Sequence, residues 1–281
     1  MSGVLFIVAT PIGNLEDITR RAVRTLSEVD RIAAEDTRHT QHLLAHLGLQ
    51  KPMISLHEHN EHERIAMILD LLSEDLDIAL VSDAGTPLIS DPGFPLLRAV
   101  IEAGFRVVPI PGVSSVITAL CAAGVPTDRF CFHGFLPHKN AERLNKLEAI
   151  AQLQGTQVLL ESTHRIERLL QQLHQLMPQA QVVVAKELTK RHENFIRGQA
   201  VDCLDALHQA PELRKGEFVV LIHQPDISAV NKSVLDVEKL LKALLLHMPL
   251  KAAVKIAVDA SGGKKNELYQ LALEISESSR K

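Results

Sequence analysis

Short apolar runs rich in β-branched residues alternate along this chain with longer stretches of helical periodicity. In the first half the runs cover residues 4–9, 32–34, 78–81 and 107–110, and helical patterns cover about 17–28 and 92–103. Strands that are apolar along their whole length are buried on both faces, as in parallel sheets covered by helices. The sequence therefore predicts an α/β fold built on a mostly parallel sheet.

The same alternation restarts in the second half of the chain. Helical patterns cover residues 114–123 and 165–176. Further strands are expected at residues 130–132, 157–160, 182–185 and 218–222. We place a soft boundary near residues 112–125 and expect two α/β lobes, residues 1–115 and 116–226. Two such lobes meet at a cleft, which is a common place for a ligand.

A separate helical segment is expected after residues 224–228, which are typical of a linker. Beyond them apolar residues recur at helical spacing in three successive groups. The groups are Leu240, Leu241, Leu244, Leu245 and Met248; Val254, Ala257 and Val258; and Leu268, Leu271 and Ile275. Three short helices predict a small, helix-turn-helix-like module over residues 233–281.

Charge is distributed unevenly between this module and the rest of the chain. The chain has a net charge of −4, yet the segment from Asn231 onward has nine Lys and Arg against six Asp and Glu. A basic tail on an acidic body indicates a polyanionic partner, or it only keeps a helical tail soluble. The lysines expected to contact phosphates are Lys251, Lys255, Lys264 and Lys265.

The cysteines and the apolar pattern limit the compartment in which the chain works. Cys121, Cys131 and Cys203 form no C-x-x-C pair, so neither a disulfide framework nor a thiolate zinc site is expected. No signal peptide is recognisable, and no run of about 18 apolar residues could span a membrane. We therefore expect a cytoplasmic protein that does not bind membranes.

Three of the predicted strands end in loops rich in Gly, Pro, Ser, Thr or Asp. These loops cover residues 10–14, 83–87 and 111–115. Tight turns between strands and helices need Gly and Pro in any case, but ligands of open parallel sheets bind at this edge. The Ser114 and Ser115 N–H groups would open a helix, where free donors collect acceptors. Three such loops together favour a ligand site.

A dense polar cluster, Glu35-Asp36-Thr37-Arg38-His39, follows the second predicted strand. Helix capping explains Asp36 or Thr37 but not all five residues. Asp36, Arg38 and His39 are therefore candidate catalytic residues on the substrate side.

Two further polar groups leave alternatives open. His57, His59 and Glu61 would share one face of a strand and could bind a metal, unless the segment turns helical at Asn60. A polar rim facing the substrate is favoured, and no metal is expected. Asp83 and Asp91 could act as an acid–base pair, but Asp91 before Pro92 has the pattern of a helix N-cap.

Several longer blocks carry a resemblance to a known family. VATPIGNLEDIT at residues 8–19 resembles the opening signature of the ribosomal RNA small-subunit methyltransferase I family. Further blocks are similar to that family in the same order. They are AEDTRHT at 34–40, HEHNE at 57–61, LVSDAGTPLISDPG at 80–93, PIPGVSS at 109–115, GFLPHK at 134–139, ELTK at 187–190, GEFVV at 216–220 and KKNELYQLAL at 264–273.

The resemblance implies a tetrapyrrole-methylase fold: two α/β lobes with S-adenosylmethionine in the cleft between them, and a homodimer. It also implies 2′-O-methylation of a cytidine in the decoding region of 16S rRNA, within the small ribosomal subunit. Residues carried over as cofactor contacts are Ile12, Asp83, Thr86, Ile89, Ser114, Ser115, Leu160, Ala185 and Leu188.

The chain departs from the family pattern in two loops, and other functions stay open. Val113 and Thr163 stand where many members have Pro. The Gly-rich first loop of porphyrinoid enzymes is replaced by Thr-Pro-Ile-Gly-Asn, which argues against a tetrapyrrole substrate. The alternatives are a methyltransferase of the same fold acting on a porphyrinoid or a protein side chain, and a non-catalytic ribosome assembly factor.

Overall fold

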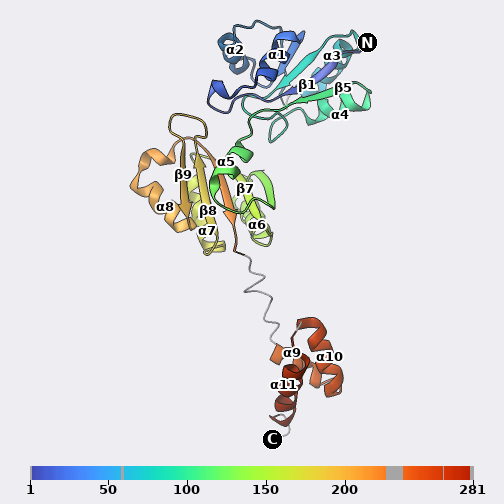
Figure 1. Cartoon of the computed structure of the whole chain (residues 1–281), viewed down its shortest axis with the longest axis vertical. Helices are drawn as coiled ribbons and strands as arrows, with labels where there is room; N and C mark the ends of the chain where they lie inside the picture. The colour runs from blue at the N-terminus through green and yellow to red at the C-terminus, as the bar shows by residue number, and fades with distance from the viewer. Residues whose placement is uncertain (1, 58–59, 226–236, 262, 279–281) are drawn as a thin grey trace. The chain divides into compact units, whose positions relative to one another are not determined.

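A computed structural model describes residues 2–57, 60–225, 237–261 and 263–278. The chain forms two compact units, Met1–Gln224 and Pro225–Lys281 (Figure 1). The first unit contains two five-stranded sheets, and the second contains only helices. This agrees with the predicted α/β fold followed by a small helical module.

The first sheet is entirely parallel, in the order β3-β2-β4-β1-β5. Its strands are β1 (Val4–Val8), β2 (Arg31–Ala34), β3 (Met53–Ser55), β4 (Ile78–Val81) and β5 (Arg106–Ile110). Helices α1 (Arg20–Glu28) and α2 (Thr37–His46) cover one face, and α3 (Glu61–Ser73) and α4 (Phe94–Glu102) cover the other. All four residues of the central strand β4 are buried, as the apolar run at 78–81 predicts.

The first helix begins three residues later than predicted. Asn14 accepts a hydrogen bond from the Glu16 N–H and starts a short 3-10 turn, Leu15–Asp17. The backbone is then extended at Ile18 and Thr19, and the Thr19 hydroxyl caps α1 by accepting from the Ala22 N–H at 3.1 Å. Two successive caps divide what the apolar periodicity alone presents as one helix.

The second sheet is mixed, in the order β6-β7-β10-β8-β9. Its strands are β6 (Phe130–Phe135), β7 (Thr156–Ser162), β8 (Gln181–Lys186), β9 (Asn194–Gly198) and β10 (Glu217–His223). Only β6 and β7 pair in parallel. The prediction of a mostly parallel sheet is therefore wrong for this lobe. The connection from β8 to β9 is too short for a crossover helix and forces an antiparallel pair.

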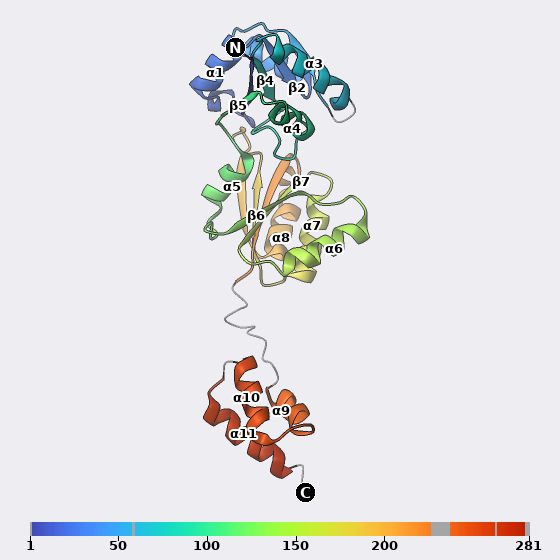
Figure 2. The ribbon, with the colours of Figure 1, turned by 90° about the vertical axis from the view of Figure 1, so that its right-hand side faces the viewer.

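Helices sandwich the second sheet. Helix α5 (Ser115–Ala123) packs on one face, and α6 (Asn140–Ala151), α7 (Ile166–Leu176) and α8 (Ala200–Gln209) pack on the other (Figure 2). The face under α5 also receives Ile12 from the first lobe, so the two lobes share one hydrophobic cluster. A 3-10 turn, Pro211–Arg214, leads into β10.

The C-terminal unit is built from α9 (Val237–Leu245), α10 (Leu250–Ser261) and α11 (Lys265–Ser278). Its core contains Leu241, Ala253, Val254, Ala257, Leu268, Ala272 and Ile275. The predicted apolar groups supply most of this core. The predicted start of the module at residue 233 and most of the linker lie outside the described residues. Among the described residues, none of the helices is long and apolar enough to cross a bilayer.

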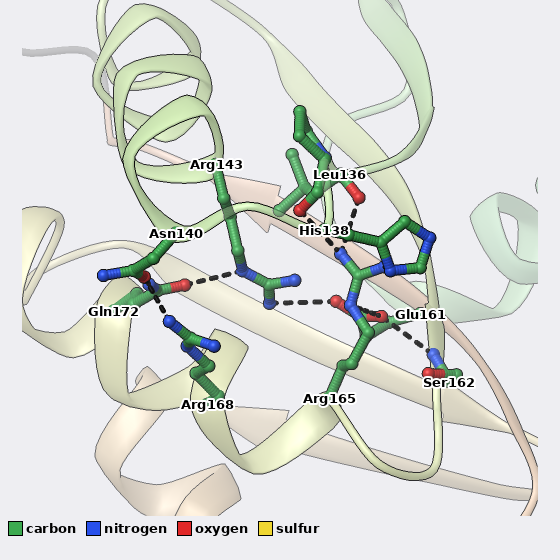
Figure 3. A network of polar contacts seen from close by, with 10 residues as sticks. Leu136, His138, Asn140, Arg143, Glu161, Ser162, Arg165, Arg168 and Gln172 are labelled. Atoms are coloured by element: carbon green, nitrogen blue, oxygen red, sulfur yellow. Dashed lines mark hydrogen bonds and ion pairs between the residues drawn. The ribbon is translucent and has the colours of Figure 1, made fainter.

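A buried carboxylate, Glu161, joins several elements of the second lobe at the end of β7. Its oxygens lie 2.9 Å from Arg143 Nη2, on α6, and 3.2 Å from Arg165 Nε, at the start of α7. Both guanidinium groups point toward this carboxylate in Figure 3. Arg165 Nη2 also donates to the Leu136 carbonyl at 2.6 Å, so the segment after β6 is tied to the same charge.

Arg143 lies fully inside the protein and depends on this network. It is 1% exposed and donates from Nε to Gln172 Oε1 at 2.8 Å. Burial lowers the pKa of Arg143, and the Glu161 charge opposes that shift. Gln172 donates in turn to Asn140 Oδ1, which also accepts a hydrogen bond from Arg168. Hydrogen bonds between α6 and α7 therefore surround the buried pair of Arg143 and Glu161.

Replacing Glu161 with Gln should lower the free energy of unfolding by about 3–5 kcal/mol, because Arg143 would remain buried without its counter-charge. Urea denaturation followed by circular dichroism measures the change. Glu148→Gln is the matched control, since Glu148 is exposed on α6 and should tolerate the same substitution. Equal stabilities for the two variants would contradict this role of Glu161.

Candidate functional site

The chain leaves the adjacent strands β1 and β4 in opposite directions. After β1 it crosses to β2 on one side, and after β4 it crosses to β5 on the other. In open α/β sheets, ligands bind beside the carboxyl ends of strands at such a point. The two loops pair here, since the Thr10 N–H donates to the Gly85 carbonyl at 2.8 Å and the Gly85 N–H donates back at 3.0 Å.

Two glycines allow the loops at this edge to pack closely. Gly85 has φ +86°, and a Cβ there would lie 3.2 Å from Ile12 Cγ2. A Cβ on Gly112 would lie 2.8 Å from the Ala9 Cβ. The loops after β1, β4 and β5 therefore form one packed rim, which fixes the position of Ile12.

An apolar cavity of about 330 Å³ lies where this rim meets the second lobe. Four of the nine carried-over cofactor residues line it: Ile12, Ser115, Leu160 and Leu188. The remaining walls are Phe135, Glu161, Ser162, Thr163, His164, Gly216, Glu217, Phe218 and Val219. Residues that are far apart in the sequence thus converge on one cavity, which we call the apolar cavity.

The other five carried-over residues do not line the apolar cavity. Thr86 donates from its hydroxyl to the Val113 carbonyl at 3.0 Å, and Ala185 is buried in the shared core. Ser114 caps α5 without a side-chain cap hydrogen bond, and Ile89 is 47% exposed. Asp83 lines a neighbouring pocket.

This neighbouring pocket, the polar pocket, has a volume of about 250 Å³ and shares Ile12 and Glu217 with the apolar cavity. Its polar side chains include His39, Asp83 and Lys190. Lys190 is held by Glu187 at 3.1 Å and by Glu217 at 3.0 Å. A substrate group in the polar pocket would therefore lie next to a ligand in the apolar cavity.

Of the three candidate catalytic residues, only His39 lines the polar pocket. Asp36 is the N-cap of α2 and accepts a hydrogen bond from the Arg38 N–H at 2.9 Å. Hydrogen bonds from the Arg38 side chain and backbone hold the pKa of Asp36 well below its usual range. A carboxylate that binds protons so weakly is a poor base, so Asp36 is better suited to fixing the helix that carries His39.

Asp83 and Asp91 lie close enough for their charges to interact. Asp83 Oδ1 accepts a hydrogen bond from the Asp36 N–H at 3.0 Å, which links the loop after β4 to the start of α2. Burial raises the pKa of Asp91, a hydrogen bond with Ser82 opposes the shift, and the Asp83 charge adds to it. The N-cap interpretation of Asp91 is wrong, because Gly93, at φ +116°, is the N-cap of α4.

The predicted strand face with His57, His59 and Glu61 is wrong. Strand β3 ends at Ser55, and Glu61 opens α3, where its buried carboxylate accepts a hydrogen bond from the Leu96 N–H at 3.2 Å. Residues 58 and 59 lie outside the described residues. The residues that the structure describes contain no group of three His, Cys, Asp or Glu side chains arranged to hold a metal.

The loop after β8 contacts the first lobe. Leu188 is its only residue among the cofactor contacts that the resemblance implies. Glu187 and Thr189 have positive φ angles of 50° and 64°, which non-glycine residues rarely adopt. The Thr189 hydroxyl accepts a hydrogen bond from the Asn14 N–H of the first lobe at 3.1 Å. Strained backbone of this kind is concentrated at ligand-binding sites. In the sequence, this loop is marked by the ELTK block at residues 187–190.

Comparison with known proteins identifies the family. Residues 4–203 match the family described as Tetrapyrrole (Corrin/Porphyrin) Methylases, and residues 232–276 match the RsmI C-terminal HTH domain. The chain is 46% identical over 275 residues to "Ribosomal RNA small subunit methyltransferase I" of Haemophilus influenzae, covering 97% of each chain. It is 45% identical to the protein of the same name from Escherichia coli O157:H7, covering 97% of this chain and 95% of that one.

Solved structures of this fold are similar at lower identity. A diphthine synthase has a TM-score of 0.62 at 15% identity and covers 79% of this chain and 90% of its own. A uroporphyrin-III C-methyl transferase from Thermus thermophilus, complexed with S-adenosyl homocysteine, has a TM-score of 0.54 at 18% identity and covers 81% and 100%. These similarities establish the fold of the two lobes.

Gly85→Ala should destabilise the protein more than Gly104→Ala. Both glycines have positive φ, +86° and +80°, so a left-handed alanine costs about 1–2 kcal/mol in each. An added Cβ at Gly104 has nothing within 4 Å. At Gly85 the Cβ would press on Ile12 at 3.2 Å, which should lower the free energy of unfolding by about 1 kcal/mol more. Urea denaturation of the two variants checks this. Equal losses would show that Ile12 is not held by close packing.

Proposed function

The chain belongs to the tetrapyrrole methylase family, and within it to the ribosomal RNA small subunit methyltransferase I family, and we propose that it methylates the 2′-hydroxyl of a cytidine in the decoding region of 16S rRNA. The methyl donor is S-adenosylmethionine and the substrate is the small ribosomal subunit. The observation that carries the proposal is an apolar cavity of about 330 Å³ beside a polar pocket, in a chain with these relatives. A homodimer in the cytoplasm remains a prediction.

The residues of the apolar cavity fit this donor. Ile12, Leu160 and Leu188 offer flat apolar contact of the kind that an adenine ring requires. Helix α5 begins beside the cavity at Ser115, and its first N–H groups are not capped by the Ser114 side chain. Free N–H groups at a helix start favour a carboxylate such as that of the methionyl group. When bound, the donor supplies a methyl group on a sulfonium that is already activated.

The protein's part in the reaction is mainly alignment. A 2′-hydroxyl directed into the polar pocket would face the apolar cavity across Ile12 and Glu217, and holding two reactants in line removes much of the entropic barrier. His39 is proposed to accept the hydroxyl proton, because it lines the polar pocket and a neutral imidazole nitrogen is a hydrogen-bond acceptor. Asp36 and Arg38 assist by fixing the first turn of α2.

Labelled S-adenosylmethionine tests the function directly. Label should enter 16S rRNA of small subunits as 2′-O-methylcytidine in the wild-type reaction. His39→Ala should slow this transfer by roughly 10²-fold or more, without changing the Kd for the donor. His46→Ala is the matched control, because His46 lies exposed on the same helix. Label in a porphyrinoid or in protein would contradict the assignment, and an unimpaired His39→Ala variant would exclude the proposed base.

The C-terminal unit is proposed to add affinity for RNA. Lys251 and Lys255 are exposed one turn apart on α10, and Lys265 is exposed at the start of α11, which supports contacts with phosphates. Lys264 is less available, because it pairs with Glu267 at 3.3 Å.

Changing Lys251, Lys255 and Lys265 to Gln should raise KM for the subunit and flatten its salt dependence. The logarithmic slope should fall by about 0.7–0.9 for each phosphate that the variant no longer neutralises. The Kd for S-adenosylmethionine should not change. Lys242→Gln is the control from the same unit, because Lys242 already pairs with Glu238 at 2.7 Å. An unaltered slope in the triple variant would refute the role of this unit in RNA binding.

A further inference from the structure

A third cavity, of about 550 Å³, opens in the second lobe at the end of β8. Its lining includes Lys186, Arg191 and Lys215, and we call it the Lys186 cavity. Gly216 lines both this cavity and the apolar cavity, and the consecutive residues Glu187 and Leu188 line one each. The two cavities therefore adjoin, with Gly216 and the Glu187–Leu188 backbone as a shared wall.

Lys186 is buried to an unusual degree for a lysine. It is 4% exposed, and its place in β8 puts its side chain on the same face as Val182 and Val184, where Leu213 also packs. No hydrogen bond or ion pair links its ammonium group to any other described residue. The buried stem carries the ammonium group to the open space of the cavity, where it is available to an anion.

The other charges of the cavity favour an anion as well. Arg191 and Lys215 are exposed at its edge and have no ion-pair partner among the described residues. One of the three carboxylates that line it is paired with a cation, and a second accepts a backbone hydrogen bond. Glu187 binds Lys190 at 3.1 Å and the Glu217 N–H at 3.0 Å, and Glu193 accepts from the Thr189 N–H at 2.6 Å. Three cations without an ion pair therefore face two carboxylates without an ion pair, those of Glu193 and Glu212.

We propose that the Lys186 cavity binds a backbone phosphate of the RNA substrate next to the nucleotide that is methylated. The inference rests on the proposed function, since it requires RNA at the neighbouring polar pocket. Lysine and arginine together suit a phosphodiester, the lysine as a point charge and the arginine through its planar donors. Phosphate contacts fix the register of a strand without reading its bases. A phosphate held behind the shared wall would set which ribose faces the methyl donor.

Lys186→Met tests the site, because it keeps the apolar stem and removes the charge. KM for small subunits should rise roughly tenfold, as expected when one charge-assisted hydrogen bond is removed. The logarithmic slope of kcat/KM against salt should fall by about 0.7–0.9. The Kd for S-adenosylmethionine should stay unchanged. Lys146→Met, at an exposed lysine on α6, is the control and should leave KM and the slope as in the wild type.

A second variant, Arg191→Ala with Lys215→Ala, keeps the test valid if Lys186→Met fails to fold, since both side chains are exposed. It should also raise KM and flatten the slope. Unchanged KM and slope in the folded variants would overturn the proposal, provided that the wild type methylates subunits. A wild type without methyl transfer would instead refute the proposed function.

Titration with inorganic phosphate, followed by ³¹P NMR, distinguishes a cavity that binds the RNA backbone from one that binds a free anion. Phosphate should compete with the subunit in the wild type, and this competition should disappear in Lys186→Met if the cavity is an RNA site. Phosphate binding that leaves subunit kinetics unaffected would mean that the cavity takes a free phosphate, and would overturn the proposal.

Discussion

The buried charge of Glu161 is the constraint on which the second lobe depends. A carboxylate that is 2% exposed needs counter-charges, and they come from two different helices as Arg143 and Arg165. The chain turns immediately afterwards, and the Thr163 hydroxyl bonds both the N–H and the carbonyl of Gly216, at 2.9 and 2.8 Å. The ends of β7 and β10 are thereby joined, and together they form a wall of the apolar cavity.

The two lobes meet through loops whose backbones are strained. Four of the five non-glycine residues with positive φ in the described part of the chain lie in two loops, Leu88 and Ser90 after β4, and Glu187 and Thr189 after β8. Each loop touches the opposite lobe. A Cβ on Gly134 would lie 3.1 Å from Ser90 Oγ, and Thr189 binds the Asn14 N–H. Contacts between the lobes therefore stabilise conformations that the loops alone would avoid.

The sequence predicted what local patterns determine and missed what distant contacts determine. The strand at 78–81 is evident because all four residues are apolar, whereas β3 has only three residues and β9, Asn194–Gly198, has no apolar run. The antiparallel pairing of the second sheet leaves no trace in periodicity. Within the candidate site, the family blocks pointed to loops that the structure brings to the same cavities. Residue spacing alone, however, does not reveal that Asp36 is held by Arg38 or that Lys186, at the end of β8, is only 4% exposed.

The central claim is that the methyl donor lies between the lobes in the apolar cavity anchored by Glu161. A crystal structure of the chain with S-adenosylhomocysteine tests it most directly. The account predicts density for the ligand in contact with Ile12, Leu160 and Leu188, with its carboxylate near the first turn of α5. Ligand bound elsewhere, for example only on the C-terminal helices, with the apolar cavity filled by side chains, would contradict it.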